Sequence, residues 1–457
     1  MPQVDIALMA HLMRRAGFGA TRDEQEAGVA KGYEATVEEL LYPIDDSYLE
    51  KDVVDRYWID VDDMHQTDSI RAWWLYRMIN SRSPLQEKMT LFWHGLFATA
   101  YEKIMNGLAV AAQIEMFRRH SLGNFRDLLV HLSRDPAMIL WLDNNTNHKG
   151  APNENYGREL LELFSMGVGN YSEDDVKACA RALTGWTIAN HVARYPWGPF
   201  DLEFEYRPED HDDSAKEFLG HKGRFNGEDV IDIIVQHPAT GRFIARKLYD
   251  FFVSDDPPTE EAIRALSDAY FQSNYDIRSV MRALLNSDFF KEARFAKVKS
   301  PTEVVAGILR LVGDYREPKP GLVEMGWEAK YMGQEILNPP TVEGWHTGKE
   351  WIDSGALVSR VNFAADQVGN LDHPGIQAIV QRLSSQGASM SPDELVDGCL
   401  DLMGPLEVLA ETRNELLGKA RRAGETRVGR PQENAEFARR VVETLQLIVA
   451  TREFQFA

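Results

Sequence analysis

The sequence has little cysteine and no long apolar run, and each shortage excludes a class of protein. Its two cysteines, Cys179 and Cys399, are far apart and outside any Cys-x-x-Cys spacing. Neither a disulfide framework nor a zinc finger is therefore indicated, and we expect two buried thiols. No apolar run approaches the roughly eighteen residues that a membrane-spanning helix needs. A membrane span is therefore not expected.

Positive charge is also scarce. Lysine and arginine number 50 against 71 aspartates and glutamates, which gives a formal net charge of −21. A field of this sign repels nucleic acid and anionic membrane surfaces, and it suits neutral or cationic partners. Nucleic acid is therefore not expected as a partner.

The N-terminal stretch has apolar residues at helical spacing and lacks the basic and apolar regions of a signal peptide. We therefore expect a cytoplasmic protein. Thr21 is suited to cap the next helix, because Glu24 stands in the capping-box position.

Hydrophobic periodicity predicts a mainly α-helical protein. With 44% hydrophobic residues, the chain is long enough to bury a sizeable core. Residues 69–116 and 227–313 show helical spacing between Pro and Gly stop signals, whereas residues 186–227 lose it and predict a small β-hairpin excursion. We expect a large multi-helix domain, residues 1–370, that contains the candidate site, and a helical C-terminal subdomain, residues 371–457, packed on it.

The stretch from 134 to 176 carries the densest polar signals. Asp143 ends an apolar run and opens a loop of short polar side chains, which bond their own backbone and compete with helix. Asn153 is suited to cap the helix that follows, and Glu154 falls in its first turn, where negative charge is favoured. We expect that helix to end near Gly167.

On a helical wheel, one side of this helix is apolar and the opposite sector holds Asn155, Glu159 and Glu162. Glu154, Arg158 and Glu162 have the i, i+4, i+8 spacing of an ordinary surface ion-pair ladder. Glu159 is the exception, because it borders the apolar arc and Arg158 cannot easily serve it as well. A buried carboxylate needs a cation, a metal or a raised pKa. Both a structural and a functional interpretation therefore remain open.

A second helix, predicted from Pro84 onward, carries Glu87 and His94 seven residues apart on the face opposite its apolar arc. A histidine among aromatic residues is more often a hydrogen-bonded structural residue than a ligand. Glu87 on the same face favours the functional interpretation.

Two further loops have unusual composition. His211 lies among four acidic residues, which suits a hard cation in charge but matches no known ligand spacing; a solvated acidic loop is the alternative. The stretch 338–355 contains Trp345 and Trp351, which need burial or a ligand. We expect it to be a rigid loop that forms a wall of the cleft.

Several segments together resemble the bacterial family called domain of unknown function 1800. They cover the chain from Leu8 to its end in the expected order and include PLQEKMTLFWHGLFAT, NENYGRELLELFSMG, HPATGRFIARKLYDFFV and NPPTVEGW. The family has no established activity. Members often carry export signals and are frequently encoded beside a sulfatase-like companion protein, so the resemblance implies such a partner and an extracellular or envelope substrate.

The chain departs from the family pattern at two positions. Many members read W-H-x-H-F and E-L-H-T-L-G, and this chain has Leu96 and Phe164 in place of the second histidine of the first motif and the histidine of the second. If those histidines are metal ligands, this protein holds its metal with fewer groups or holds none. The residues that remain at matching positions are His94, Asp143, Glu154, Asn155, Glu159, Glu162 and His211.

We favour a metal-dependent hydrolase, in which His94, Glu159 and Glu162 are both metal ligands and catalytic residues between two facing helices. A divalent metal of unknown identity is the expected cofactor, and Glu159 is a ligand or the general base. The alternative is a non-catalytic binding or assembly scaffold, whose Trp-rich and acidic loops bind a glycan or a cationic protein. Residues expected to contact the substrate are Asp143, Asn155, Arg158, His211 and Trp345.

Overall fold

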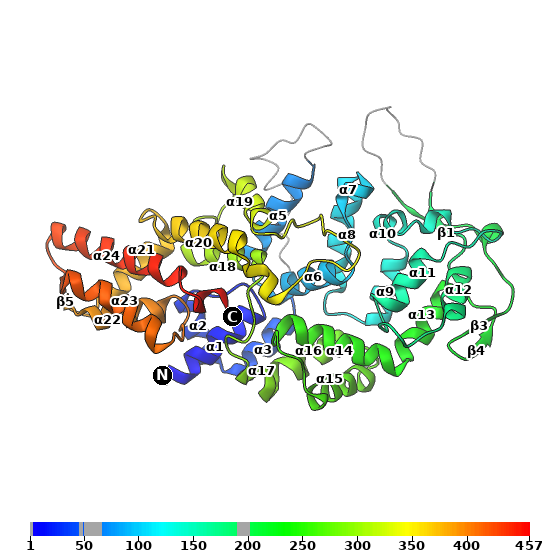
Figure 1. Cartoon of the computed structure of the whole chain (residues 1–457), viewed down its shortest axis with the longest axis horizontal. Coiled ribbons are helices and arrows are strands. Elements are labelled where there is room, and N and C mark those ends of the chain that lie inside the picture. Colours follow the sequence, from blue (N-terminus) through cyan, green and yellow to red (C-terminus); the bar gives the residue numbers. More distant parts are fainter. Residues whose placement is uncertain (1–2, 45–48, 50–65, 190–201) are drawn as a thin grey trace.

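The protein is mainly α-helical, with three small two-stranded antiparallel sheets, as the periodicity predicts. The computed structural model describes residues 3–44, 49, 66–189 and 202–457. Figure 1 shows an elongated arrangement, with α21–α24 at one end and α11, α12 and the strands β1–β4 at the other. Helices α5, α6 and α8 lie between them.

The helices of the first half of the chain lead up to the first strand. They are α1 (Gln3–Arg15), α2 (Arg22–Lys31), α3 (Tyr33–Leu41), α5 (Gln66–Asn80), α6 (Pro84–Leu96), α7 (Tyr101–Ile104), α8 (Gly107–His120), α9 (Phe125–Ser133), α10 (Pro136–Trp141), η3 (Asn144–Thr146), α11 (Asn155–Glu162) and α12 (Glu173–Ala182).

The second half begins with two short antiparallel sheets and then becomes helical again. The strands are β1 (Trp186–Ile188) paired with β2 (Phe204–Tyr206), β3 (Lys216–Phe218) paired with β4 (His221–Gly223), and β5 (Ser389–Met390) paired with β6 (Thr426–Arg427). The helices are η4 (Pro208–Asp210), α13 (Gly227–Gln236), α14 (Pro238–Phe252), α15 (Glu260–Gln272), α16 (Ile277–Asn286), α17 (Asp288–Glu292), α18 (Pro301–Val312), α19 (Leu322–Tyr331), η5 (Gly348–Ile352), α20 (Ser354–Val368), α21 (Pro374–Ser384), α22 (Pro392–Leu402), α23 (Ala410–Ala423), α24 (Pro431–Val449) and η6 (Glu453–Gln455).

The C-terminal helices contact the rest of the protein along α18 and α20. Helix α24 lies against α20, and α21 lies against α18, as Figure 1 also shows. The boundary at residue 370 stays a prediction. Within the described residues, no helix is long and apolar enough to cross a membrane.

Helix α6 is buried on both of its faces. Pro84 occupies its first turn, as the sequence predicts, and Met89 and Trp93 on the apolar arc are fully buried. Glu87, Lys88 and His94 on the other face are fully buried as well. Polar groups inside a protein need partners, because a buried charge without one is strongly destabilising. The face that the wheel marked as polar is therefore packed in the interior.

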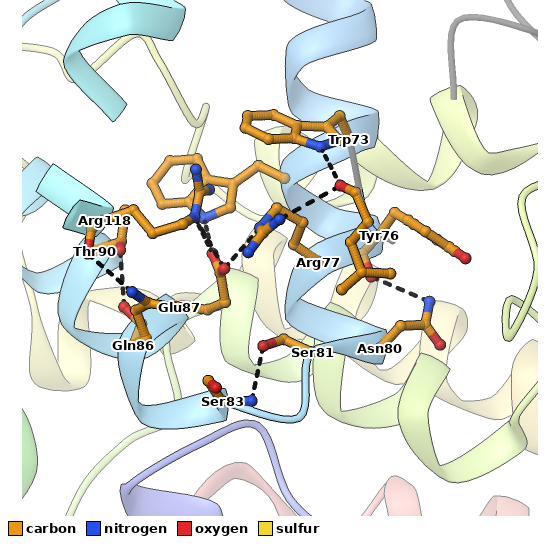
Figure 2. Close-up of polar contacts among 12 residues, drawn as sticks. Trp73, Tyr76, Arg77, Asn80, Ser81, Ser83, Gln86, Glu87, Thr90 and Arg118 are labelled. Carbon is orange, nitrogen blue, oxygen red and sulfur yellow. Dashed lines mark hydrogen bonds and ion pairs between the residues drawn. The ribbon is translucent and has the colours of Figure 1, made fainter. Parts of the chain in front are cut away.

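Glu87 finds its partners on α5 and α8. Its carboxylate accepts hydrogen bonds from Arg77 Nε at 2.8 Å, Arg118 Nε at 2.9 Å and Trp74 Nε1 at 3.1 Å. Figure 2 shows the carboxylate between the two guanidinium groups. Burial alone would raise the pKa of Glu87, but Arg118 and Arg77 outweigh it and hold the pKa below its usual value. This carboxylate therefore ties three helices together and does not serve a ligand.

Removing the charge of Glu87 tests this role. Glu87→Gln leaves Arg77 and Arg118 buried beside a neutral group, and losing one partner of a buried ion pair typically costs about 3 to 5 kcal/mol. We expect a loss of this order in the free energy of unfolding, measured by urea titration. Glu436→Gln on α24 is the control, because Glu436 forms an exposed pair with Arg439 at 2.6 Å. An equal effect of the two substitutions would contradict the role of Glu87.

Candidate functional site

His94 holds a loop against α6. It is fully buried, and its Nε2 accepts a hydrogen bond from the backbone N–H of Leu337 at 3.1 Å. The rings of Trp74 and Trp345 meet the imidazole edge-on, with centroids at 5.5 and 5.3 Å. Burial lowers the pKa of His94 to about 3, so the ring is neutral at physiological pH. The Nε2 lone pair that would bind a metal is already used.

Glu159 and Glu162 are half-buried on α11. Glu162 accepts a hydrogen bond from the hydroxyl of Tyr171 at 2.5 Å. The side chain of Glu159 has no hydrogen bond or ion pair within the described part of the chain. Burial and the neighbouring Glu162 raise the pKa of Glu159, and Glu343 adds to this effect. Glu159 is therefore an unpaired acid, as the wheel indicates.

The expected ladder along α11 is only half formed. Arg158 reaches Glu154 at 3.3 Å, which confirms the first link. The predicted link to Glu162 is wrong, because Arg158 instead donates two hydrogen bonds to the carboxylate of Glu173 on α12, at 2.8 and 2.7 Å. A guanidinium prefers a carboxylate that it can meet with two parallel hydrogen bonds. Arg158 therefore joins α11 to α12.

The residues present do not fit the expected metal. Among the described residues, no three or more side chains of His, Cys, Asp and Glu are grouped so that they could hold a metal ion. His94, Glu159 and Glu162 are thus not assembled as a metal centre, and we derive no reaction step through one. Metal binding in solution stays a prediction.

The two positions where many family members have histidine are apolar and packed. Leu96 is 9% exposed, and Phe164 is fully buried, with its ring edge-on to Phe97 at 5.4 Å. Neither supplies a polar atom that would complete a metal site.

Asp143 and Asn155 meet at the surface. Asp143 adopts a left-handed backbone conformation, and its carboxylate accepts hydrogen bonds from Lys103 Nζ at 2.9 and 3.0 Å. Asn155 Nδ2 approaches the same carboxylate at 3.5 Å. The loop after Asp143 is a structural clamp, because the side chains of Asn144 and Asn147 donate to backbone carbonyls of β1 and α12 at 2.8 Å each.

His211 belongs to the protein's interior. It is 4% exposed, and its Nδ1 is 3.0 Å from the carbonyl oxygen of Thr184. The adjacent Asp212 is paired with Arg181 at 2.7 Å, and the buried ammonium of Lys216 donates to the carbonyl oxygen of Asp212. The loop that the sequence presented as a solvated or cation-binding cluster is therefore partly folded inward and bound to α12.

Trp345 lines a cleft of about 230 Å³, here called the Trp345 cleft, and the Trp-rich loop contributes one of its walls. The floor comes from the end of α6, and the other walls come from α14, the start of α18 and the loop between α19 and α20. Three of the segments that resemble the family converge here. Residues that line the Trp345 cleft include Phe92, Gly95, Leu96, Lys247, Asp250, Phe251, Glu303, Glu343, Trp345 and Trp351.

Three charged side chains of the Trp345 cleft were not singled out from the sequence. Lys247, Asp250 and Glu343 form no ion pair or side-chain hydrogen bond within the described residues; Lys247 lies 5.4 Å from the centre of the Phe243 ring. Lys247 and Asp250 are exposed at the surface. Partial desolvation by neighbouring atoms nevertheless lowers the pKa of Lys247 and raises that of Asp250. The negative charge of Glu343 favours the protonated forms of both Lys247 and Glu159. Perturbed, unpaired groups in a cleft mark a candidate functional site.

Comparison with known proteins places the chain in a family. Residues 11–456 match the model of a family described as protein of unknown function (DUF1800). The chain belongs to this family. No curated protein and no solved structure matches it.

In this DUF1800 protein, a glycine fixes the wall of the cleft. Gly344 has φ +85°, and a Cβ atom at this position would lie 2.3 Å from the carbonyl oxygen of Gly95 on α6. Only a residue without a side chain allows the loop to approach the helix this closely. Trp345 and Glu343 are placed by this contact.

Gly344→Ala should therefore displace the loop. We expect a shift in tryptophan fluorescence and a loss of about 1 to 3 kcal/mol in stability, from strain at positive φ together with the clash. Gly333→Ala is the matched control, because Gly333 has φ +99° and no atom within 4 Å of its Cβ position. The control variant should lose stability because of strain at positive φ, but its tryptophan fluorescence should not shift. Identical spectra for both variants would refute the close contact.

Proposed function

We propose that the Trp345 cleft binds a small hydroxyl-rich ligand of the glycan class. One observation carries the proposal: the half-buried rings of Trp345 and Phe251 line the same cleft as the unpaired Lys247, Asp250 and Glu343. Sugar rings have apolar C–H faces that pack on aromatic rings and hydroxyls that bond to charged groups. A mixture of aromatic rings and unpaired charges of both signs suits this class.

The size and charge of the site support the same class. A volume of about 230 Å³ lies below the range of roughly 300 to 1,000 Å³ that holds drug-sized ligands, so a ligand of one sugar ring fits. The unpaired side chains of the cleft, two acids and one lysine, sum to a slight negative charge, and the whole chain carries −21. Neutral or cationic ligands are therefore favoured over anionic ones.

Hydrolysis of the bound ligand without a metal is the second candidate function. The raised pKa of Asp250 suits a general acid, and the lowered pKa of Lys247 brings an amine toward the range of a general base. Glu159 on α11 is a third group with a shifted pKa, which is raised. Binding without turnover is the scaffold alternative. A cytoplasmic location and a sulfatase-like companion remain predictions.

Titration of the protein with mono- and disaccharides tests the binding function. We expect at least one sugar to give saturation-transfer NMR signals, and Trp345→Ala and Glu343→Gln to weaken its binding at least tenfold, because the ring face and the hydrogen-bond acceptor are lost. Glu350→Gln is the matched control, since Glu350 lies in the same loop but does not line the cleft. No binding by any sugar, or binding that both cleft variants retain, would refute the proposal.

The same sugars, linked as glycosides, test for hydrolysis. Asp250→Asn keeps the shape of the side chain but removes its proton-donating role, so turnover should fall by two or more orders of magnitude while binding persists. A chelator should have no effect on turnover. Turnover that the chelator abolishes would restore the metal hypothesis, and binding without any turnover would leave the scaffold function alone.

A further inference from the structure

A second cavity, here called the Arg14 cavity, lies where the end of α1 meets the C-terminal segment. It measures about 70 Å³ and is lined by residues of α1, α18, the segment after α22 and the C-terminal segment. Arg14, Gln25, Lys299, Gly404 and Phe454 carry its polar groups. It is separate from the Trp345 cleft, and only Glu303 lines both.

Arg14 is incompletely paired. One of its guanidinium nitrogens donates to the carbonyl oxygen of Gly404 at 2.5 Å. Its Nε and second terminal nitrogen are buried and have no hydrogen-bond partner within the described residues, and neither has the buried side-chain oxygen of Gln25. Buried polar atoms are almost always satisfied, so such a group in a cavity indicates a bound water or ion. A guanidinium needs an acceptor.

Lys299 adds a second cation to the same cavity. Its ammonium donates to the carbonyl oxygen of Phe454 at 2.6 Å and lies 4.1 Å from the centre of that ring. Burial and the positive charge of Arg14, Arg360 and Arg15 together lower its pKa to about 7, against the opposing effect of Glu303. Arg14 and Lys299 thus bring two basic groups to one cavity.

The nearby carboxylates are already engaged. Glu303 binds Arg15 at 3.1 Å and also pairs with Lys88, and it accepts the backbone N–H of Ser300 at 2.6 Å. Glu407 pairs with Arg294 at 2.9 Å. Neither is free to neutralise Arg14 and Lys299.

We propose that the Arg14 cavity binds one small inorganic oxyanion, of the size of phosphate or sulfate, between α1 and the C-terminal segment. An oxyanion presents several acceptors, which matches a guanidinium with two unused donors beside an ammonium. A cavity of about 70 Å³ is well above the roughly 10 to 15 Å³ that one water molecule needs on the same measure, which leaves room for one such ion. The ion joins the N-terminal helix to the end of the chain.

Calorimetric titration of the full chain with sodium phosphate tests the site, with sulfate and chloride as further arms at matched ionic strength. We expect saturable binding at one site, for the oxyanions more than for chloride. Arg14→Met and Lys299→Met should each weaken binding at least tenfold. Arg439→Met is the control, because Arg439 is exposed on α24 and far from the cavity in sequence. Binding that both cavity variants retain would overturn the proposal.

A crystal of the unmodified protein grown with selenate, a sulfate analogue, provides a readout that needs no variant to fold. The expected result is one anomalous peak in contact with the Arg14 guanidinium and the Lys299 ammonium. Water alone in the cavity, or no saturable heat with any of the three anions, would overturn the proposal.

Discussion

Lys88 and Glu303 form an ion pair in the protein's interior, and the positions of both cavities depend on it. Lys88 is fully buried on α6, and its ammonium also donates to the carbonyl oxygen of Gly17 at 3.0 Å. Glu303 opens α18 and contributes to the walls of both the Trp345 cleft and the Arg14 cavity. A buried ion pair fixes relative positions because either charge is strongly destabilising alone. Helices α6 and α18 are locked together at this point.

The Trp345 cleft follows from the burial of α6. The end of this helix lines the cleft, and His94 holds the backbone of Leu337. The lack of a side chain at Gly344 lets the loop approach the carbonyl oxygen of Gly95 on α6. The histidine that resembled a metal ligand is therefore a support for the loop that carries Trp345. The chemistry of the cleft lies in charged groups from α14 and the loop, where pairing is incomplete.

Local features could be predicted from the sequence because they depend on neighbouring residues. The Thr21–Glu24 capping box, the start of α6 at Pro84 and the strand that became β2 are all present. The burial of both faces of α6 could not be predicted. A helical wheel shows which side chains share a face, but it does not show which other helices pack against that face. The partners of Glu87 come from α5 and α8, as much as 31 residues away along the chain.

The candidate site shows the same limit. Trp345 and Glu159 stood out by local composition and spacing, and the fold places Trp345 in the cleft and leaves Glu159 unpaired on α11 among the described residues. In the sequence, Lys247 and Asp250 do not differ from other charged residues of a surface helix. Their lack of an ion-pair partner depends on how α14 packs against the loop that carries Glu343. The pairing of Arg158 with Glu173 could likewise not be predicted, because it depends on the packing of α12 against α11.

Carboxyl footprinting of the native protein tests most directly whether the cleft carboxylates are unpaired. Carbodiimide coupling to an amine, followed by mass spectrometry, measures how fast each carboxylate reacts. The account predicts that Asp250 and Glu343 react faster than Glu173, which is 65% exposed but bound to Arg158, and that a bound sugar protects them. Equal or slower reaction of Asp250 and Glu343, or no protection by any bound ligand, would contradict it.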